Sequence, residues 1–384
     1  MAKLGDIFTL QMGKTPARAK EEYWNNGDNN WVSISDLSTY SKYVGETKET
    51  ISDLAVKESG IKPAPTDTVI MSFKLTLGKT AITVQPTYTN EAIMAFIPNG
   101  NYPVHPSYFY HFFGGRDWSK GTNRAVMGTT LNKATLSEIE VSVPTLAEQI
   151  DIAERLDKVD TLISQRQQQL SKIDELVKSR FIELFGDPVN NPMGWHVADF
   201  SEYITFLTSG SRGWAQYFSD NGEYFITIKN VKNCRITLDN VQHIVPPDNA
   251  EAKRTRVKEG DLLISITADL GRTGVVSKEI ADHGGYINQH LTCIRLDQSR
   301  IRPLYAAYFL ESDAGKNQFQ AKNQNGVKAG LNFNAINSLK LLVPPIEVQD
   351  AFISFVEQTD KLKFDILMSI KNTHNALHGR LIHF

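Results

Sequence analysis

The second half of this chain repeats the first. At an offset of 200, and without a gap, the matched pairs are Leu131-Asn132 with Leu331-Asn332, Val143-Pro144 with Val343-Pro344, Gln149 with Gln349, Asp160 with Asp360, Leu162 with Leu362, Arg180 with Arg380 and Ile182 with Ile382. A chain that carries one pattern twice is normally built from two copies of one structural unit. We therefore predict an internal tandem duplication with pseudo-twofold character.

Nearer the start of each copy the repetition is looser. Val69-Ile70-Met71-Ser72 and Leu77-Gly78-Lys79-Thr80 correspond, at an offset of 193, to Leu262-Leu263-Ile264-Ser265 and Leu270-Gly271-Arg272-Thr273. Drifting offsets of this kind place the insertions in loops. Short apolar runs bounded by Gly, Asp and Pro are typical of strands, so each copy should begin with a mixed domain. With 384 residues, the chain is long enough for two or three such domains, and the fold class is α+β.

A long helix follows each mixed domain. Thr145 and Glu148 have the spacing of a capping box, and Gly186 with Pro188 marks the helix end. Pro344-Pro345 opens the second helix. We therefore divide the chain into mixed domains at 1–144 and 195–344, helices at 145–186 and 345–384, and a linker at 187–194.

Along each predicted helix, apolar residues recur at intervals of three and four positions, which predicts a buried seam on one helix face. Two such stripes in one chain bury each other most simply as an antiparallel coiled-coil hairpin. The stripe is rougher in the second helix, where Thr359, Lys363 and Thr373 interrupt it. The predicted seam residues are Leu156, Val159, Ile163, Leu170, Ile173, Val356, Leu362, Ile366, Ile370 and Leu377.

Motifs for catalysis or metal binding are incomplete. Gly78-Lys79-Thr80 has the end of a phosphate-binding loop, but Phe73 stands where that loop needs its first Gly. His374 and His378 are four residues apart without the Glu of a zinc protease, so a solvated helix surface is the favoured interpretation. We predict no catalytic residue, no metal and no cofactor in this chain.

The cysteine content and the lack of long apolar segments indicate where the protein is located. Cys234 and Cys293 are too few for a disulfide framework or a Cys-based zinc site, which suits a reducing compartment. The first residues lack the apolar run of a signal peptide, and no stretch approaches the ~18 apolar residues of a membrane span. We expect a cytoplasmic protein without membrane contact.

Charge is informative by region. The formal net charge is −2, which removes the argument from a strongly basic protein. Residues 145–194 hold 6 basic and 9 acidic side chains, whereas residues 195–344 hold 17 and 15. Cations in the mixed domains cluster in loops beside amides and hydroxyls, which suits phosphate contacts and the reading of base edges, although ordinary solvated loops are an equal alternative. The candidate DNA-binding residues are Lys14, Arg18, Lys20, Lys74, Arg116, Lys120, Arg124, Arg212, Lys229, Asn230, Arg272, Lys322 and Lys328.

Two mixed domains, each followed by Leu-Asn, then Val-Pro and a long helix opening at Gln149 or Gln349, resemble the DNA specificity subunit of Type I restriction-modification systems. The resemblance covers the whole chain. It implies two target-recognition domains that read the halves of a split, asymmetric DNA sequence. It also implies two modification subunits that methylate adenine with S-adenosylmethionine, and restriction subunits that use ATP. Pro345 and Asp350 depart from Thr145 and Ile150 of the first copy.

A second interpretation is a non-enzymatic scaffold whose helical hairpin binds protein and whose mixed domains bind a peptide or a glycan. Binding to duplex DNA that falls steeply with salt and needs a methyltransferase partner would favour the first interpretation. Neither the recognised bases nor the spacer length follows from the sequence.

Overall fold

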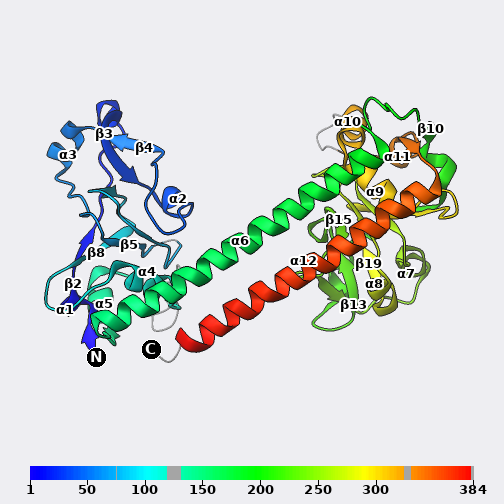
Figure 1. Cartoon of the computed structure of the whole chain (residues 1–384). Coiled ribbons are helices and arrows are strands. Elements are labelled where there is room, and N and C mark those ends of the chain that lie inside the picture. The colour runs from blue at the N-terminus through cyan, green and yellow to red at the C-terminus, as the bar shows by residue number, and fades with distance from the viewer. Residues whose placement is uncertain (75, 119–130, 324–329, 382–384) are drawn as a thin grey trace. The chain divides into compact units, whose positions relative to one another are not determined.

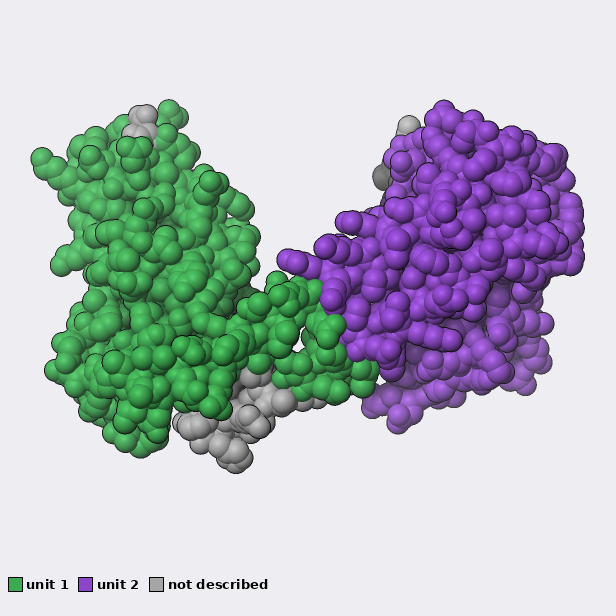
Figure 2. All heavy atoms as spheres, viewed as in Figure 1, with its two compact units in different colours: residues 1–167, 367–384 green, residues 168–366 purple. Residues whose placement is uncertain are grey.

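The computed structural model describes residues 1–74, 76–118, 131–323 and 330–381 (Figure 1). Two compact units make up the chain: residues 1–167 with 367–384, and residues 168–366 (Figure 2). Each of the two long helices contributes residues to both units. Within the described ranges, no helix is long and apolar enough to cross a membrane.

The sheets of the first unit are small and mostly antiparallel. Strand order is β2-β8-β5-β6 in the largest, β4-β3-β7 in the next, and β1-β9 in a two-stranded ribbon. The elements are β1 (Ala2–Lys3), α1 (Leu4–Ile7), β2 (Phe8–Met12), a 3-10 turn (Glu21–Tyr23), β3 (Trp24–Val32), α2 (Ile34–Leu37), β4 (Glu49–Ile51), α3 (Asp53–Ser59), β5 (Val69–Ser72), β6 (Thr80–Ile82), β7 (Tyr88–Thr89), β8 (Ile93–Pro98), α4 (Pro106–Gly115), α5 (Lys133–Ser137) and β9 (Glu140–Val141). This mixture of strands and helices agrees with the predicted fold class.

The second unit has a sheet in which β11-β20-β17-β18 continues into β15-β14, a sheet β12-β16-β13-β19, and a ribbon β10-β21. Its strands are β10 (His196–Asp199), β11 (Ile204–Ser209), β12 (Phe218–Ser219), β13 (Glu223–Ile226), β14 (Val231–Lys232), β15 (Cys234–Ile236), β16 (Gln242–Ile244), β17 (Leu262–Ser265), β18 (Thr273–Val275), β19 (Gly285–Ile287), β20 (Leu291–Leu296) and β21 (Lys340–Val343). Its helices are α7 (Ala250–Thr255), α8 (Lys278–His283), α9 (Pro303–Glu311), α10 (Asp313–Lys322) and α11 (Phe333–Asn337), with 3-10 turns at Phe200–Tyr203, Trp214–Tyr217 and Ile228–Asn230.

The two long helices are α6 (Leu146–Phe185) and α12 (Ile346–Leu381). Thr145 and Glu148 form the predicted capping box: the backbone N–H of Thr145 donates to Glu148 at 2.8 Å, and that of Glu148 to the Thr145 hydroxyl at 3.4 Å. The Thr145 hydroxyl also donates to the Glu148 carboxylate at 2.8 Å, and this bond, with that from the Thr145 N–H, holds the pKa of Glu148 below its usual value. At the other end Gly186 adopts a left-handed φ of 76°, which a glycine allows without strain. Helix α6 thus begins and ends within one residue of the predicted range 145–186.

The apolar seam differs from prediction in α12. Leu362 is 56% exposed, whereas Thr359, taken as an interruption, is only 3% exposed. Lys363 is half-buried and its ammonium lies 2.5 Å from Asp174 of α6. Other predicted seam residues are buried or half-buried: Leu156, Val159, Ile163, Leu170, Ile173, Val356, Ile366 and Ile370. Leu377 lies in α12, but its side chain is outside the described part. In α12, the position of a residue in the three-and-four spacing therefore decides whether it is buried in the seam, even where the residue is polar.

The core of the second unit includes the long helices. Phe181 and Phe185 of α6 face Phe352 of α12 at ring-centroid distances of 5.3 and 5.5 Å, and all three are buried together with Tyr305 of α9. In the first unit the buried core receives Ala153 from α6, with Ile152 partly buried beside it. The apolar contact between mixed domain and helix is therefore the larger in the second unit.

Strands β2 and β11 end at glycines in the same surroundings. The N–H of Gly13 donates to Ile93, and the next residue, Lys14, donates to Thr89; Gly210 and Ser211 make the same bonds to Leu291 and Ile287. A Cβ on Gly13 would lie 2.2 Å from the Thr89 carbonyl oxygen, and one on Gly210 would lie 2.1 Å from that of Asn288. Both glycines are required by close approach of the backbone.

We expect Gly13→Ala and Gly210→Ala each to destabilise its unit by about 1–3 kcal/mol, because the added methyl must displace backbone. Gly45→Ala is the matched control, since the nearest atoms to its Cβ are Tyr40 ring carbons at 3.6 and 3.8 Å. Chemical denaturation followed by fluorescence measures the free energies. Equal stability of all three variants would contradict the predicted clash.

Candidate nucleic-acid interface

One loop recurs at the same sheet position in both units, between β5 and β6 and between β17 and β18. In the first unit Ser72 anchors it: its hydroxyl accepts the Lys79 N–H at 3.0 Å and donates to the Thr76 carbonyl. Ser265 anchors the second loop in the same way, through Arg272 at 2.8 Å and the Asp269 carbonyl. These hydrogen bonds fix both loop backbones without using the side chains at the tips.

A left-handed glycine closes each of these loops. Gly78 and Gly271 both have φ of 80°, and each lies under an aromatic ring. A Cβ at Gly78 would approach Trp118 to 2.6 Å, and one at Gly271 would approach Phe319 to 2.2 Å. The rings come from the region after α4 in one unit and from α10 in the other. In both loops, the closing glycine thus packs against an aromatic ring.

The first loop presents Lys74, whose ammonium lies 5.3 Å from the Phe73 ring centroid. In the second loop Arg272 pairs with Asp269 within the loop itself. Arg116 lies near the first loop's support, with its guanidinium 5.4 Å from the Trp118 ring. Partial burial lowers the pKa of Arg116 from its usual value. Three predicted loop cations therefore have defined places beside the recurring loops.

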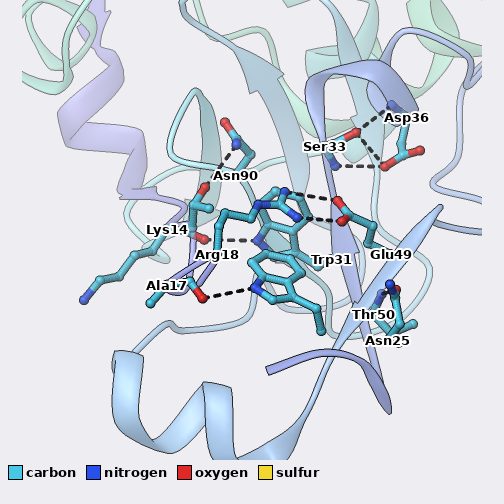
Figure 3. A network of polar contacts seen from close by, with 12 residues as sticks. Lys14, Ala17, Arg18, Asn25, Trp31, Ser33, Asp36, Glu49, Thr50 and Asn90 are labelled. Carbon is cyan, nitrogen blue, oxygen red and sulfur yellow. Dashed lines mark hydrogen bonds and ion pairs between the residues drawn. The ribbon is translucent and has the colours of Figure 1, made fainter. Parts of the chain in front are cut away.

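In the predicted cluster from Lys14 to Lys20, Arg18 lies against Glu49 and the indole of Trp31 reaches the backbone of Lys14 (Figure 3). The Arg18 guanidinium stacks 3.7 Å from the Trp24 ring centroid and donates to both oxygens of Glu49, at 2.5 and 3.1 Å. Trp31 donates from its indole to the Lys14 carbonyl at 3.0 Å. These contacts hold Arg18 in one geometry and neutralise part of its charge.

Lys20 and Lys14 also have partners inside the first unit. The Lys20 ammonium lies 2.7 Å from both Glu58 and the Tyr23 hydroxyl. The hydrogen bond with Glu58 is the main reason that the pKa of Lys20 is raised and that of Glu58 is lowered. Lys14 donates to the Ser59 carbonyl. All three cations remain exposed, but their partners must be exchanged or shared before they bind a phosphate.

In the second unit the predicted residues separate into exposed and interior ones. Arg212 and Lys229 are exposed. Lys322 donates to the Ser338 hydroxyl at 2.8 Å. Asn230 is only 3% exposed: its amide oxygen accepts from Thr227, and its amide nitrogen donates to the Thr237 carbonyl at 3.1 Å. The prediction of a DNA contact is therefore wrong for Asn230. Its side-chain amide is buried and makes its hydrogen bonds within the surrounding turn.

Lys120, Arg124 and Lys328 lie outside the described residues. The sequence interpretation also missed a set of charged residues that connect mixed domain to helix. Lys42 donates to both oxygens of Asp157 at 2.6 Å, and the His111 ring nitrogen Nε2 lies 2.7 Å from the same carboxylate. In the second unit Arg235 donates to Asp360. The repeat pairs Asp360 with Asp160 and not with Asp157, so it was only a partial signal for these contacts.

Cys234 and Cys293 are buried, and burial raises the pKa of both thiols well above the usual value, so neither is an activated nucleophile. Among the residues with described positions, no three His, Cys, Asp or Glu side chains gather as they would around a metal ion. What the two units share is a rigid loop with cations at or beside it.

Known proteins resemble this chain in sequence and in fold. A specificity subunit of the Type I restriction enzyme MjaIX, from Methanocaldococcus jannaschii, is 28% identical over 249 residues, which cover 60% of this chain and 57% of that protein. The EcoR124I/EcoR124II specificity subunit from Escherichia coli is 29% identical over 46% of this chain and 45% of its own length. The matches thus span about half the length of these relatives.

Two solved structures share the fold. A chain from a structure on complex assembly and conformational transition of the type I R-M system aligns over 99% of this chain and 95% of its own, with a TM-score of 0.62 and 15% identity. The S subunit from M. genitalium aligns over 99% and 93%, with a TM-score of 0.53 and 12% identity. The family model for the Type I restriction modification DNA specificity domain matches residues 1–174 and 205–373. Because that model matches most of both halves, the chain belongs to the Type I restriction-modification DNA specificity family.

Proposed function

We propose that this chain is the DNA specificity subunit of a Type I restriction-modification complex, in which each mixed domain reads one half of a split, asymmetric target. The observation that carries the proposal is the recurring loop with its serine anchor, left-handed glycine and aromatic support. It occurs once in each matched half of a chain that belongs to this family. Two rigid platforms of one design, with different side chains at their tips, suit recognition of two different half-sites.

We further propose that α6 and α12 form the antiparallel hairpin that separates these domains. Support comes from the order of contacts in the second unit, where Phe181 meets Phe352 and Asp174 meets Lys363. From the first contact to the second, the residue number falls in α6 and rises in α12, as expected for antiparallel helices. The length of the helices then sets the spacer between the half-sites. The two mixed domains, residues 1–144 and 195–344, each read their own half-site independently.

The chemistry belongs to partner chains in this proposal. Two modification subunits would supply S-adenosylmethionine and methylate adenine, and restriction subunits would supply ATP-dependent cleavage. Such a role fits the predicted cytoplasmic location. The proposed contacts to DNA are the predicted cations, with Asn230 removed from the set. Exposed Arg212 and Lys229 and the loop residue Lys74 are the first to test.

Reconstitution with the companion modification subunits tests the function directly. We expect the complex to transfer methyl groups from S-adenosylmethionine to one split sequence in duplex DNA, and the chain alone to transfer none. Sequencing of the methylated DNA identifies the target. Robust methyl transfer by the chain alone, or methylation without sequence preference by the complex, would contradict the proposal.

Lys74→Ala should weaken DNA binding by the complex about equally for all sequences and lower the slope of log affinity against log salt by about one, because one phosphate contact is lost. Lys3→Ala is the control, since Lys3 pairs with Glu138 at the β1-β9 ribbon. Fluorescence anisotropy at several salt concentrations gives both slopes. A scaffold that binds no DNA predicts no salt-dependent binding in any variant.

A further inference from the structure

Each mixed domain meets its following helix through a cation held against a helix carboxylate. In the first unit Lys42 reaches Asp157 of α6, with His111 of α4 on the same carboxylate. In the second unit Arg235 of β15 reaches Asp360 of α12, at 3.1 Å from Nε and 2.5 Å from Nη2. Neither pair involves the proposed DNA-binding residues.

The two cations lie within one residue of matching positions beside the sheet. Tyr43, beside Lys42, pairs in parallel with Ile82 of β6, and Arg235 pairs in parallel with Val275 of β18. The offset of 193 that relates the two halves equates Ile82 with Val275. Each unit therefore has a cation next to the matching strand, β6 in the first unit and β18 in the second, although the surrounding segments differ in structure.

The third member of each cluster comes from a matching helix. His111 of α4 is 9% exposed in its side chain, and its second ring nitrogen lies 3.8 Å from Asp160. Tyr308 of α9 holds the corresponding position and is close enough to Arg235 and Asp360 for both charges to affect its pKa. The Asp157 carboxylate is thus held by both Lys42 and His111, whereas Asp360 is held by Arg235, with Tyr308 nearby.

These groups are partly shielded from solvent, which strengthens their interaction relative to an open surface pair. The Lys42 side chain is 19% exposed and Asp157 37%. Burial alone would raise the pKa of Asp157, but the hydrogen bonds from Lys42 and His111 outweigh it and hold that pKa below its usual value. The carboxylate is therefore ionised, and the contact is lost only as the pH falls through this lowered pKa.

We infer that Lys42, Asp157 and His111 in the first unit, and Arg235 with Asp360 in the second, are positioning residues that fix the angle at which each mixed domain meets its helix. The inference rests on the proposed function, because that angle sets the distance and phase between the two half-sites. The first cluster matters more, since the apolar core between domain and helix is smaller there.

The test uses the complex with its modification subunits and DNA duplexes that carry the native half-sites at the native spacer or at spacers one base pair shorter or longer. Asp157→Asn and Lys42→Met should lower the preference for the native spacer by about fivefold, as expected for loss of one partly shielded ion pair. The sequence of both half-sites should stay the same. Lys42→Arg keeps the cation and should keep the preference.

Asp151→Asn is the matched control, because Asp151 pairs with Arg155 on the same helix and touches no mixed domain through that pair. Asp360→Asn makes the same test in the second unit if the first variants fold poorly. Lower thermal stability with an unchanged spacer preference would overturn the inference. If the wild-type complex methylates no defined sequence, the proposed function itself fails, which is a different result.

Discussion

Replacing residues 195–330 with the equivalent domain of another specificity subunit should change one half of the recognised DNA sequence completely and leave the other half unchanged. The returning segment, Leu331 to Val343, stays native in this exchange. It contains the Asn332 cap of α11 and strand β21, whose partner strand β10 is supplied by the incoming domain. The native segment that leads into α12 is therefore kept, and the incoming domain must supply a β10 strand that pairs with β21.

Methylome sequencing of cells that express the exchanged subunit with its modification partners measures the result. Methylation of the original target should fall to background, because one half-site is no longer read. The reciprocal exchange of residues 1–130 is the control and should change the other half-site. If either exchange altered both half-sites together, the two domains would not read DNA independently.

Helix α6 was predictable because its signals are local. The capping box of Thr145 and Glu148 and the left-handed Gly186 depend on groups only a few residues apart in the sequence. The recurring loops were predictable for a related reason. Ser72 with Gly78, and Ser265 with Gly271, reappear at one offset because both residues are needed for the same backbone turn.

The seam of α12 shows where local signals fail. Phe352, Val356, Thr359, Lys363 and Ile366 follow strict four-three spacing, yet apolarity pointed to Leu362. A half-buried lysine is stable there because Asp174 of the other helix pairs with it. That partner lies 189 positions away in the sequence, so no window along the chain reveals it.

Asn230 was misassigned for the opposite reason. The pattern of Thr227 followed three residues later by Asn230 is itself a capping signal, and the structure uses it in this way. Its position between Lys229 and Lys232 suggested a base contact instead. Charge clustering alone does not separate residues that face solvent from residues that close a turn. Likewise, the partners of Arg18 and Lys20, Glu49 and Glu58, come from distant parts of the domain.

Phe352→Ala should destabilise the second unit by about 3–5 kcal/mol, because it leaves a cavity where both long helices and the mixed domain meet. The Phe352 side chain is fully buried and touches the rings of Phe181, Phe185 and Tyr308, the last at 5.0 Å between centroids. Loss of this ring removes contact from α6 and α9 together. The unit should therefore unfold at lower temperature, and the complex should lose the methylation that needs the second half-site.

Phe364→Ala is the control on the same helix, since Phe364 is 63% exposed and its truncation should change stability by less than about 0.5 kcal/mol. Differential scanning calorimetry separates the two variants by the temperature of the first unfolding transition. If Phe364→Ala leaves stability intact but prevents binding of the modification subunits, its ring belongs to the partner surface. Equal stability of Phe352→Ala and the wild type would instead show that the helices are not part of the folded core, and the proposed hairpin would lose its physical basis.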